Sequence, residues 1–213
     1  MAVGDTRLGT LLDQWCGRAF LLAGGLFVVF AGLWGAFAFT SVSSESVQNV
    51  VGPVGWTIAF VGLLGIYSKV AAGGHVLPKA AVVFAGIGCL GGSVTAVGNL
   101  ATVLDVIPAL PAWFAALQLL LLVGIIPGFL TAAAVVLRLS RTTRRLGLFL
   151  ILPAVIFAVN IVRVATLGST TPIWSPFVLG AAQAVVLLGI GWTISTGQLQ
   201  SEQYPRASGS SVE

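Results

Sequence analysis

Charged residues are scarce in this chain of 213 residues: Asp, Glu, Lys and Arg together make up 8% of it, against 57% hydrophobic residues. A soluble domain usually carries about 25% charged residues. So few charges cannot cover a water-facing surface, and the mean hydropathy of +1.05 indicates the same. The composition therefore excludes an ordinary soluble domain and predicts an integral membrane protein, with the lipid bilayer as its surroundings.

Titratable groups are missing from the middle of the apolar runs, where no Asp, Glu, His or Lys is found. This absence argues against a proton-coupled pump, a bis-histidine haem protein and a retinal protein. The net charge of +4 comes from basic residues that are sparse, so there is no broad basic face for a nucleic acid. We therefore expect no nucleic-acid partner.

Cysteine is nearly absent as well, with only Cys16 and Cys89. Cys16 precedes the first apolar run and Cys89 lies inside the third, so we expect different depths and no disulfide. The chain has no paired C-x-x-C motif, no Walker A sequence, no H-E-x-x-H and no G-x-S-x-G. We therefore predict no catalytic residue, no metal site and no cofactor.

Long apolar runs are what the chain does contain, and a membrane-spanning helix needs roughly 20 such residues. Six runs qualify: 18–39, 54–70, 80–100, 113–137, 146–167 and 176–195. They lack the alternation of barrel strands. The predicted fold is an all-α integral membrane bundle of six transmembrane helices. Its domains are an N-terminal segment 1–17, the transmembrane domain 18–196 and a polar, disordered tail 197–213.

Basic residues occur in every second connection between the runs and at both ends of the chain. The fourth connection holds four of them: Arg138, Arg141, Arg144 and Arg145. Because Lys and Arg are retained in the cytoplasm, this alternation predicts that both termini are cytoplasmic. We expect a multi-pass protein of the plasma membrane. An alternative is cleavage of the first run as a signal peptide after Ala38, although the run exceeds the usual signal core.

Proline and tryptophan recur before the even-numbered runs. We expect these prolines to begin helices and these tryptophans to lie in the headgroup layer; the pairs are Pro53 with Trp56, Pro111 with Trp113, and Pro172 with Trp174. Pro127 and Pro153 lie inside runs and are expected to kink them.

Small residues are abundant in the third run, which we expect to be central in the bundle. Gly88, Gly91 and Gly92 let neighbouring helices approach closely, or line a substrate path. Gln118 and Gln183 are single amides in the fourth and sixth runs, and we expect them to bond across helix interfaces.

Arg163 lies seventeen residues after Leu146, about 25 Å along a helix and so near the outer boundary. It either extends into the headgroups or joins a polar cluster under the outer surface. Asn160 lies one turn earlier on the same face, and Asn99 and Asp105 end the third run. The predicted outer cluster is thus Asn99, Asp105, Asn160 and Arg163, acting as structural glue or lining a shallow pocket.

The segment Asn160-x-x-Arg163, late in an apolar helix, resembles the Arg-bearing segment of exosortase and archaeosortase transpeptidases. That resemblance implies a Cys, Arg and His set, in this chain order, on the outer side. Cys89 is the only cysteine inside a run and no histidine follows Arg163, so the resemblance covers one helix and lacks the acid or base.

Three functions remain open. The first is a non-catalytic scaffold, assembly partner or sensor-like subunit, with a membrane-protein partner or a second copy. The second is a facilitator of a small neutral or apolar solute, which the glycines and internal prolines favour. The third is a membrane enzyme that uses the outer cluster.

Overall fold

The computed structural model describes residues 7–40, 45–70, 76–139, 144–168 and 172–196, and within these ranges the chain is entirely helical between its turns. Six helices are long and apolar enough to cross a membrane. Their bounds are α1 Arg7–Phe39, α2 Glu45–Val70, α3 Val76–Val103, the fourth span, α6 Arg144–Leu167 and α7 Ser175–Ser195. The fourth span is made of α4 Phe114–Val123, the π-helical turn η2 Gly124–Gly128 and α5 Phe129–Leu139.

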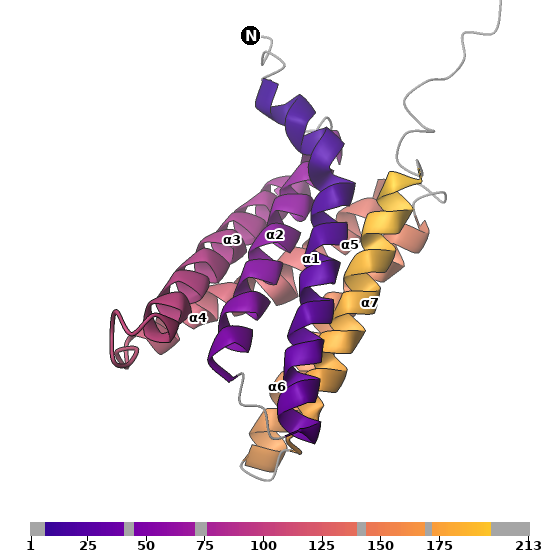
Figure 1. Ribbon diagram of the computed structural model, residues 1–213. Helices are drawn as coiled ribbons and strands as arrows, with labels where there is room; N and C mark the ends of the chain where they lie inside the picture. Colours follow the sequence, from indigo (N-terminus) through magenta and orange to yellow (C-terminus); the bar gives the residue numbers. More distant parts are fainter. Residues whose placement is uncertain (1–6, 41–44, 71–75, 140–143, 169–171, 197–213) are drawn as a thin grey trace, which may run out of the picture.

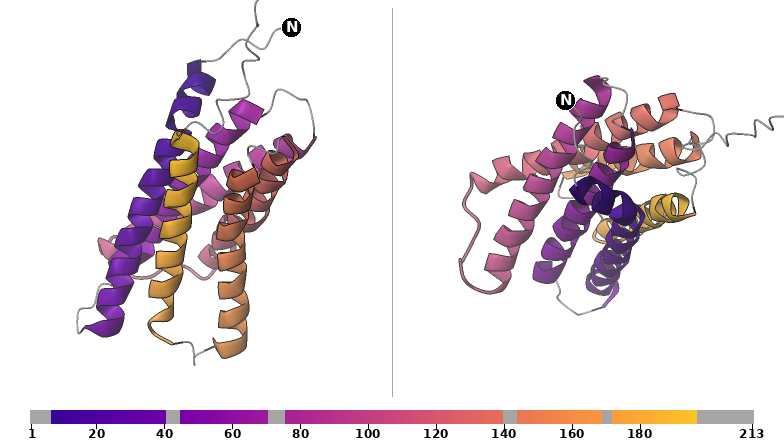
Figure 2. Two further views of the ribbon diagram at one scale, coloured as in Figure 1. Left: turned by 90° about the vertical axis from the view of Figure 1, so that its right-hand side faces the viewer. Right: turned by 90° about the horizontal axis from the view of Figure 1, so that it is seen from above.

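The six spans form a closed ring in which each packs against its neighbours in sequence, and α7 packs against α1 to close it. Helices α3, α2, α1 and α7 lie side by side in one row (Figure 1). The fourth span runs behind this row, from α4 beside α3 to α5 beside α6. Figure 2 shows the second layer that α5 and α6 form beside α1 and α7.

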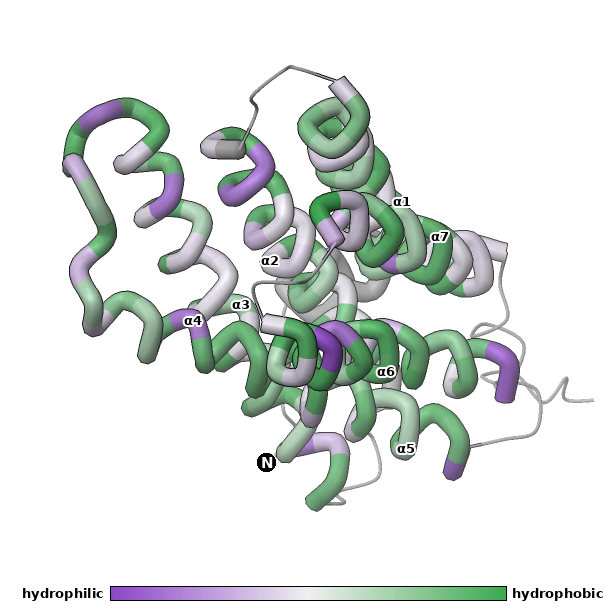
Figure 3. The backbone as a smooth tube through the Cα atoms, turned by 90° about the horizontal axis from the view of Figure 1, so that it is seen from below, coloured by the Kyte–Doolittle hydropathy of each residue, from purple (hydrophilic) through white to green (hydrophobic). Residues whose placement is uncertain are grey.

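Basic residues gather at one end of the bundle, here called the basic end. The start of α1 meets the end of α7 there, because Gly17 faces Ser195, and the end of α5 meets the start of α6, because Gly147 faces Leu137. The described cations at this end are Arg18, Lys79, Arg138, Arg144 and Arg145. The turn after α3, the end of α6 and the start of α7 lie at the other, far end of the bundle. Figure 3 views the molecule from that end and shows that hydrophobic positions dominate the helices.

The first helix is longer than predicted. Residues 7–17, expected as a separate N-terminal segment, continue into the first span without a break in α1. Residues 1–6 and 197–213 lie outside the described part of the chain, so the predicted tail is not described.

The core is an aromatic cluster around Trp56, which is 4% exposed. Its ring lies 5.1 Å from that of Phe27, 5.9 Å from Phe129, 6.0 Å from Phe157 and 6.2 Å from Phe60, between centroids. These rings come from α1, α2, α5 and α6, and each such pair stabilises the fold by about 0.5–1.5 kcal/mol beyond burial. The cluster therefore packs the two layers of the bundle against each other.

The expectation for Pro53 and Trp56 is wrong. Helix α2 begins at Glu45, so Pro53 lies inside it and Trp56 lies in the core rather than near a headgroup layer. The other two pairs agree with the prediction as far as helix starts go, because Trp113 and Trp174 directly precede α4 and α7 and are exposed. The polar residues before Pro53 hid the true helix start, although Gln48 among them is fully buried in the bundle.

Pro127 interrupts the fourth span through a π-helical turn, Gly124–Gly128. A proline removes one backbone donor, and wider turns re-bond the freed carbonyls. Two side chains also bond to backbone oxygens here. The Thr131 hydroxyl donates to the Pro127 oxygen at 2.6 Å, and the Tyr67 hydroxyl donates to the Gly128 oxygen at 3.3 Å. Pro153, by contrast, lies inside an α6 that is one continuous helix.

The third span is not central, contrary to expectation. Helix α3 lies at one edge of the row and exposes Val83, Leu90 and Val97, whereas α2 has the largest buried share of the spans (Figure 1). Its three predicted glycines are nevertheless contact points. A Cβ on Gly88 would meet Gly124, and one on Gly91 would meet the Leu121 backbone. Gly92 faces Thr57 in the same way.

Candidate functional site

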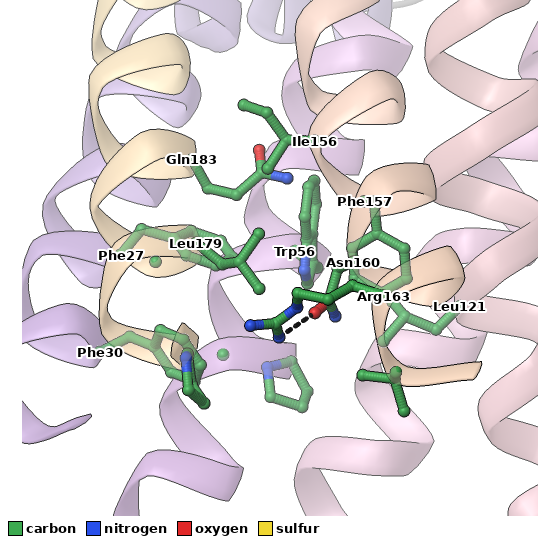
Figure 4. A pocket seen from close by; sticks show the side chains of 15 residues that line it. Phe27, Phe30, Trp56, Leu121, Ile156, Phe157, Asn160, Arg163, Leu179 and Gln183 are labelled. Atoms are coloured by element: carbon green, nitrogen blue, oxygen red, sulfur yellow. Dashed lines mark hydrogen bonds between the residues drawn. The ribbon is translucent and has the colours of Figure 1, made fainter. Parts of the chain in front are cut away.

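A cavity of about 330 Å³ lies between α1, α2, α4, α6 and α7 in the far half of the bundle. Its walls are mostly apolar side chains, including Phe27, Phe30, Trp56, Phe157 and Leu179 (Figure 4). Aromatic rings line it because the core cluster ends there: Trp56 forms one wall, and Phe60 lies a turn further toward the basic end. A cavity of this size and character suits a small, largely apolar molecule.

Three polar side chains enter this apolar space: Asn160 and Arg163 from α6, and Gln183 from α7. Arg163 donates from Nη2 to Oδ1 of Asn160 at 2.7 Å, the dashed line in Figure 4. The two residues are three apart, so they lie on one face of the helix. This bond holds the guanidinium in place and leaves its Nε buried without a hydrogen-bond partner.

Gln183 is 3% exposed and donates from Nε2 to the backbone oxygen of Pro153 on α6, at 3.1 Å. A carbonyl can only accept, so the amide nitrogen must face Pro153 and Oε1 must face away. Gln183 Oε1 is buried and has no hydrogen-bond partner. The expected bond of this amide across a helix interface is therefore present, and it leaves one buried acceptor without a donor.

The Arg163 side chain points from α6 into the cavity (Figure 4). No Asp or Glu lines the cavity among the described residues, so the guanidinium charge has no acidic neighbour there. A cation placed largely out of water without a counter-charge is unfavourable.

A second cavity, of about 390 Å³, adjoins the first and shares four lining residues with it: Phe30, Pro53, Leu121 and Phe157. Its walls carry the side chains of Asn99, Gln118, Thr95 and Gln48 among apolar residues. Asn99 donates from Nδ2 to the backbone oxygen of Asn49 at 2.7 Å. The far half thus holds a charged cavity and an amide-lined cavity side by side.

The structure brings together only part of the predicted outer cluster. Asn160 and Arg163 are hydrogen-bonded, Asn99 lies in the adjoining cavity, and Asp105 lines neither. Asp105 is exposed in the turn after α3, with a φ of 54°, and no ion pair joins it to Arg163. The reason is the fold, because the fourth span packs between α3 and α6 and keeps the two residues apart.

The remaining predicted residues take separate positions. Gln118 is exposed at the wall of the second cavity and does not pair with Gln183. Arg138, Arg144 and Arg145 are exposed at the basic end, and Arg141 lies outside the described residues. The three glycines line neither cavity, so their observed role is helix packing.

Sequence reasoning missed Gln48, which is fully buried and lines the second cavity, and the role of Trp56 as a wall of the first. The polar residues just before Pro53 could have indicated Gln48, because polar side chains in the first turns of a helix can lie between helices of a bundle. Trp56 gave no such signal, because a tryptophan near the end of an apolar run suits a headgroup layer equally well.

Neither cavity is lined by a Cys, His, Asp or Glu. The described residues contain no group of His, Cys, Asp and Glu able to hold a metal, and no disulfide joins Cys16 to Cys89. What the site offers a ligand is therefore an apolar wall, amide hydrogen bonds and one guanidinium charge.

Six apolar helices of this length, closed into a ring, are compatible with a multi-pass membrane protein. Comparison of the chain with protein-family models, with curated proteins and with solved structures found no match. Its function must therefore be argued from the site itself.

Proposed function

We propose that this is a non-catalytic, sensor-like multi-pass membrane protein that binds a small, largely apolar molecule in its far-half cavity. The observation that carries the proposal is the convergence of Asn160, Arg163 and Gln183 on one apolar cavity. Apolar walls with a few oriented polar groups are the usual composition of a ligand pocket. A purely structural role would explain the hydrogen bonds of Asn160 and Gln183. It would not explain why Arg163 Nε and Gln183 Oε1 are buried without hydrogen-bond partners.

The proposed topology places the basic end in the cytoplasm and the cavity in the outer half of a plasma membrane. Its support is the collection of Arg18, Lys79, Arg138, Arg144 and Arg145 at one end, because cytoplasmic loops are enriched in Lys and Arg. A ligand would then reach the cavity from the outer leaflet or from outside. Cell fractionation with a plasma-membrane marker tests the location.

A facilitator is the main alternative, and the aromatic cluster argues against it. Trp56, Phe60 and Phe129 are buried and pack against each other on the basic side of the cavity. A solute would have to displace these rings to cross, so the geometry favours binding over passage. Solute flux through proteoliposomes that contain the purified protein would support the facilitator instead.

An enzyme that uses the outer polar residues is the other alternative. A guanidinium such as that of Arg163 can stabilise an anion, but the cavity walls supply no nucleophile with a neighbouring base. Chemical turnover of a ligand that is lost in Arg163→Ala would support this alternative over a binding role.

A partner subunit, or a second copy of the chain, is part of the sensor-like proposal because a sensor must pass its signal on. Native mass spectrometry of the protein released from its own membranes measures this directly. A stoichiometric partner or a dimer is expected; a lone monomer would contradict this part of the proposal.

The binding role is tested with a decanol that carries a photoreactive diazirine, in phosphatidylcholine nanodiscs. Leu179 lines the cavity, and its neighbour Val178 is 47% exposed on the outer face of α7. Leu179→Trp fills the cavity and is expected to abolish labelling of α6 and α7 peptides. Val178→Trp adds the same ring outside and is the matched control. Labelling that is equal in both variants would contradict the proposal.

A further inference from the structure

We infer that the ligand is an acidic amphiphile, a medium-chain carboxylate whose head group binds Arg163 and whose chain fills the apolar cavity. This inference rests on the proposed function and names the chemical class that the same site takes. It follows from three features of the cavity: an uncompensated charge, an unused donor and a limited volume.

The charge comes first. The Arg163 side chain brings a guanidinium into a cavity whose described lining has no acidic residue. The described acid expected nearest to it, Asp105, is exposed in the turn after α3 and lines neither cavity. Since a cation in an apolar surrounding is stabilised by a counter-charge, an anionic ligand supplies what the protein does not.

The hydrogen bonds define how the anion sits. Asn160 Oδ1 accepts one hydrogen from Arg163 Nη2, and it thereby fixes the plane of the guanidinium. The neighbouring Nε is buried without a partner, so the group has a donor that the protein does not use. Carboxylates bind guanidinium edges through two parallel N–H···O bonds. Gln183 Oε1 is an acceptor and does not compete with Arg163 for the anion.

The volume limits the chain. A non-hydrogen atom in a liquid occupies close to the roughly 30 Å³ of a water molecule. The cavity of about 330 Å³ therefore holds an acid of about eight to ten carbons. The lining near Arg163, with Phe30, Leu179 and Val164, gives such a chain only apolar contacts.

A phospholipid head group offers the same anionic chemistry from a different source. Its two long acyl chains exceed the cavity, whereas a medium-chain acid fits inside it, so the volume favours the free carboxylate. The two sources are separated by carrying out the binding experiment in excess phosphatidylcholine and again in lipid-free detergent.

The experiment compares two photoreactive probes, decanoic acid and decanol, each with a diazirine on the chain. Full-length protein in phosphatidylcholine nanodiscs is titrated with each probe, and labelled peptides are mapped. We expect the acid to label α6 and α7 peptides at concentrations roughly ten- to a hundredfold lower than the alcohol. Unlabelled decanoate should compete for the site, and methyl decanoate should compete only at concentrations as high as those at which decanol labels.

Two variants assign this preference to Arg163. Arg163→Gln should remove the preference for the acid while decanol still labels the cavity, which also shows that the variant is folded. Arg163→Lys keeps the positive charge but loses the planar guanidinium with its paired donors, so it should keep part of the preference for the acid. Arg138→Gln, which removes an exposed cation at the basic end, is the matched control and should behave as the unmodified protein.

The outcomes separate the two levels of the proposal. Equal labelling by acid and alcohol, unchanged in Arg163→Gln, would overturn the carboxylate inference and leave the binding cavity standing. An acid preference seen only in lipid-free detergent would overturn it too, because phospholipid would then be the anion that Arg163 binds. Labelling of neither kind in the cavity would overturn the proposed function itself.

Discussion

Asn99 on α3 donates a hydrogen bond from Nδ2 to the backbone oxygen of Asn49 on α2, at 2.7 Å. Asn49 lies four residues before Pro53, which has no N–H to bond that oxygen within the helix. A side chain of the next helix therefore satisfies the carbonyl that the proline leaves free. Backbone groups freed by proline are satisfied in this way inside membranes, where water is absent.

This relationship predicts that Asn99→Leu destabilises the protein by about 0.5–1.5 kcal/mol, the range of hydrogen bonds between membrane helices. In a Pro53→Ala background the helix bonds the Asn49 oxygen itself, so the same change should cost clearly less. Reversible unfolding in mixed micelles measures both free energies. An equal cost in the two backgrounds would show that Asn99 acts independently of the proline.

Close packing of α3 gives a second prediction, for Gly91. A Cβ at this position would lie 2.5 Å from the backbone nitrogen of Leu121, and a backbone cannot move aside as a side chain can. Gly91→Ala should therefore lower the free energy of unfolding by about 1–3 kcal/mol. Thermal unfolding in detergent measures the change.

Gly86 on the same helix is the matched control for Gly91. It is exposed, and an added Cβ would meet nothing within 4 Å. Because alanine suits a helix better than glycine, Gly86→Ala should leave stability unchanged or slightly raised. Loss of stability of the same size in both variants would contradict the assigned packing.

A third prediction concerns the aromatic cluster. Trp56 is 4% exposed and contacts four other rings, so Trp56→Ala should cost about 3–5 kcal/mol through lost packing and a new cavity. Trp192 is 68% exposed on α7, and Trp192→Ala should cost much less. Chemical unfolding of both variants, followed by circular dichroism, measures the difference. Similar costs would mean that Trp56 does not join the two layers.

The proposed topology gives a fourth prediction, tested in a variant without Cys16 and Cys89. A single cysteine replacing Val106, which is exposed in the turn after α3, should react with an impermeant maleimide in intact cells. A single cysteine replacing Arg138, exposed at the basic end, should react only after the cells are permeabilised. The reverse pattern would invert the topology, and the cavity would then lie in the cytoplasmic half.

The number and placement of the helices follow from local composition. A run of about 20 apolar residues can be recognised without knowing its neighbours, and each of the six predicted runs overlaps one of the six candidate spans. The shared end of the basic residues follows as well, because consecutive spans alternate in direction. The hydrogen bond between Asn160 and Arg163 could also be predicted from the sequence, because two residues three apart on a helix share a face.

Which helices become neighbours was decided only by the tertiary structure. The fourth span lies between α3 and α6, so Asp105 does not meet Arg163, while α7 packs against α1 and helps to enclose the cavity. In a soluble protein the polar faces of helices mark the outside. A helix surrounded by lipid is apolar on both its inner and its outer face, so its sequence carries little record of which face is buried. Side-chain shape across the helix contacts made that choice, and it placed Trp56 in the core and Arg163 in a cavity.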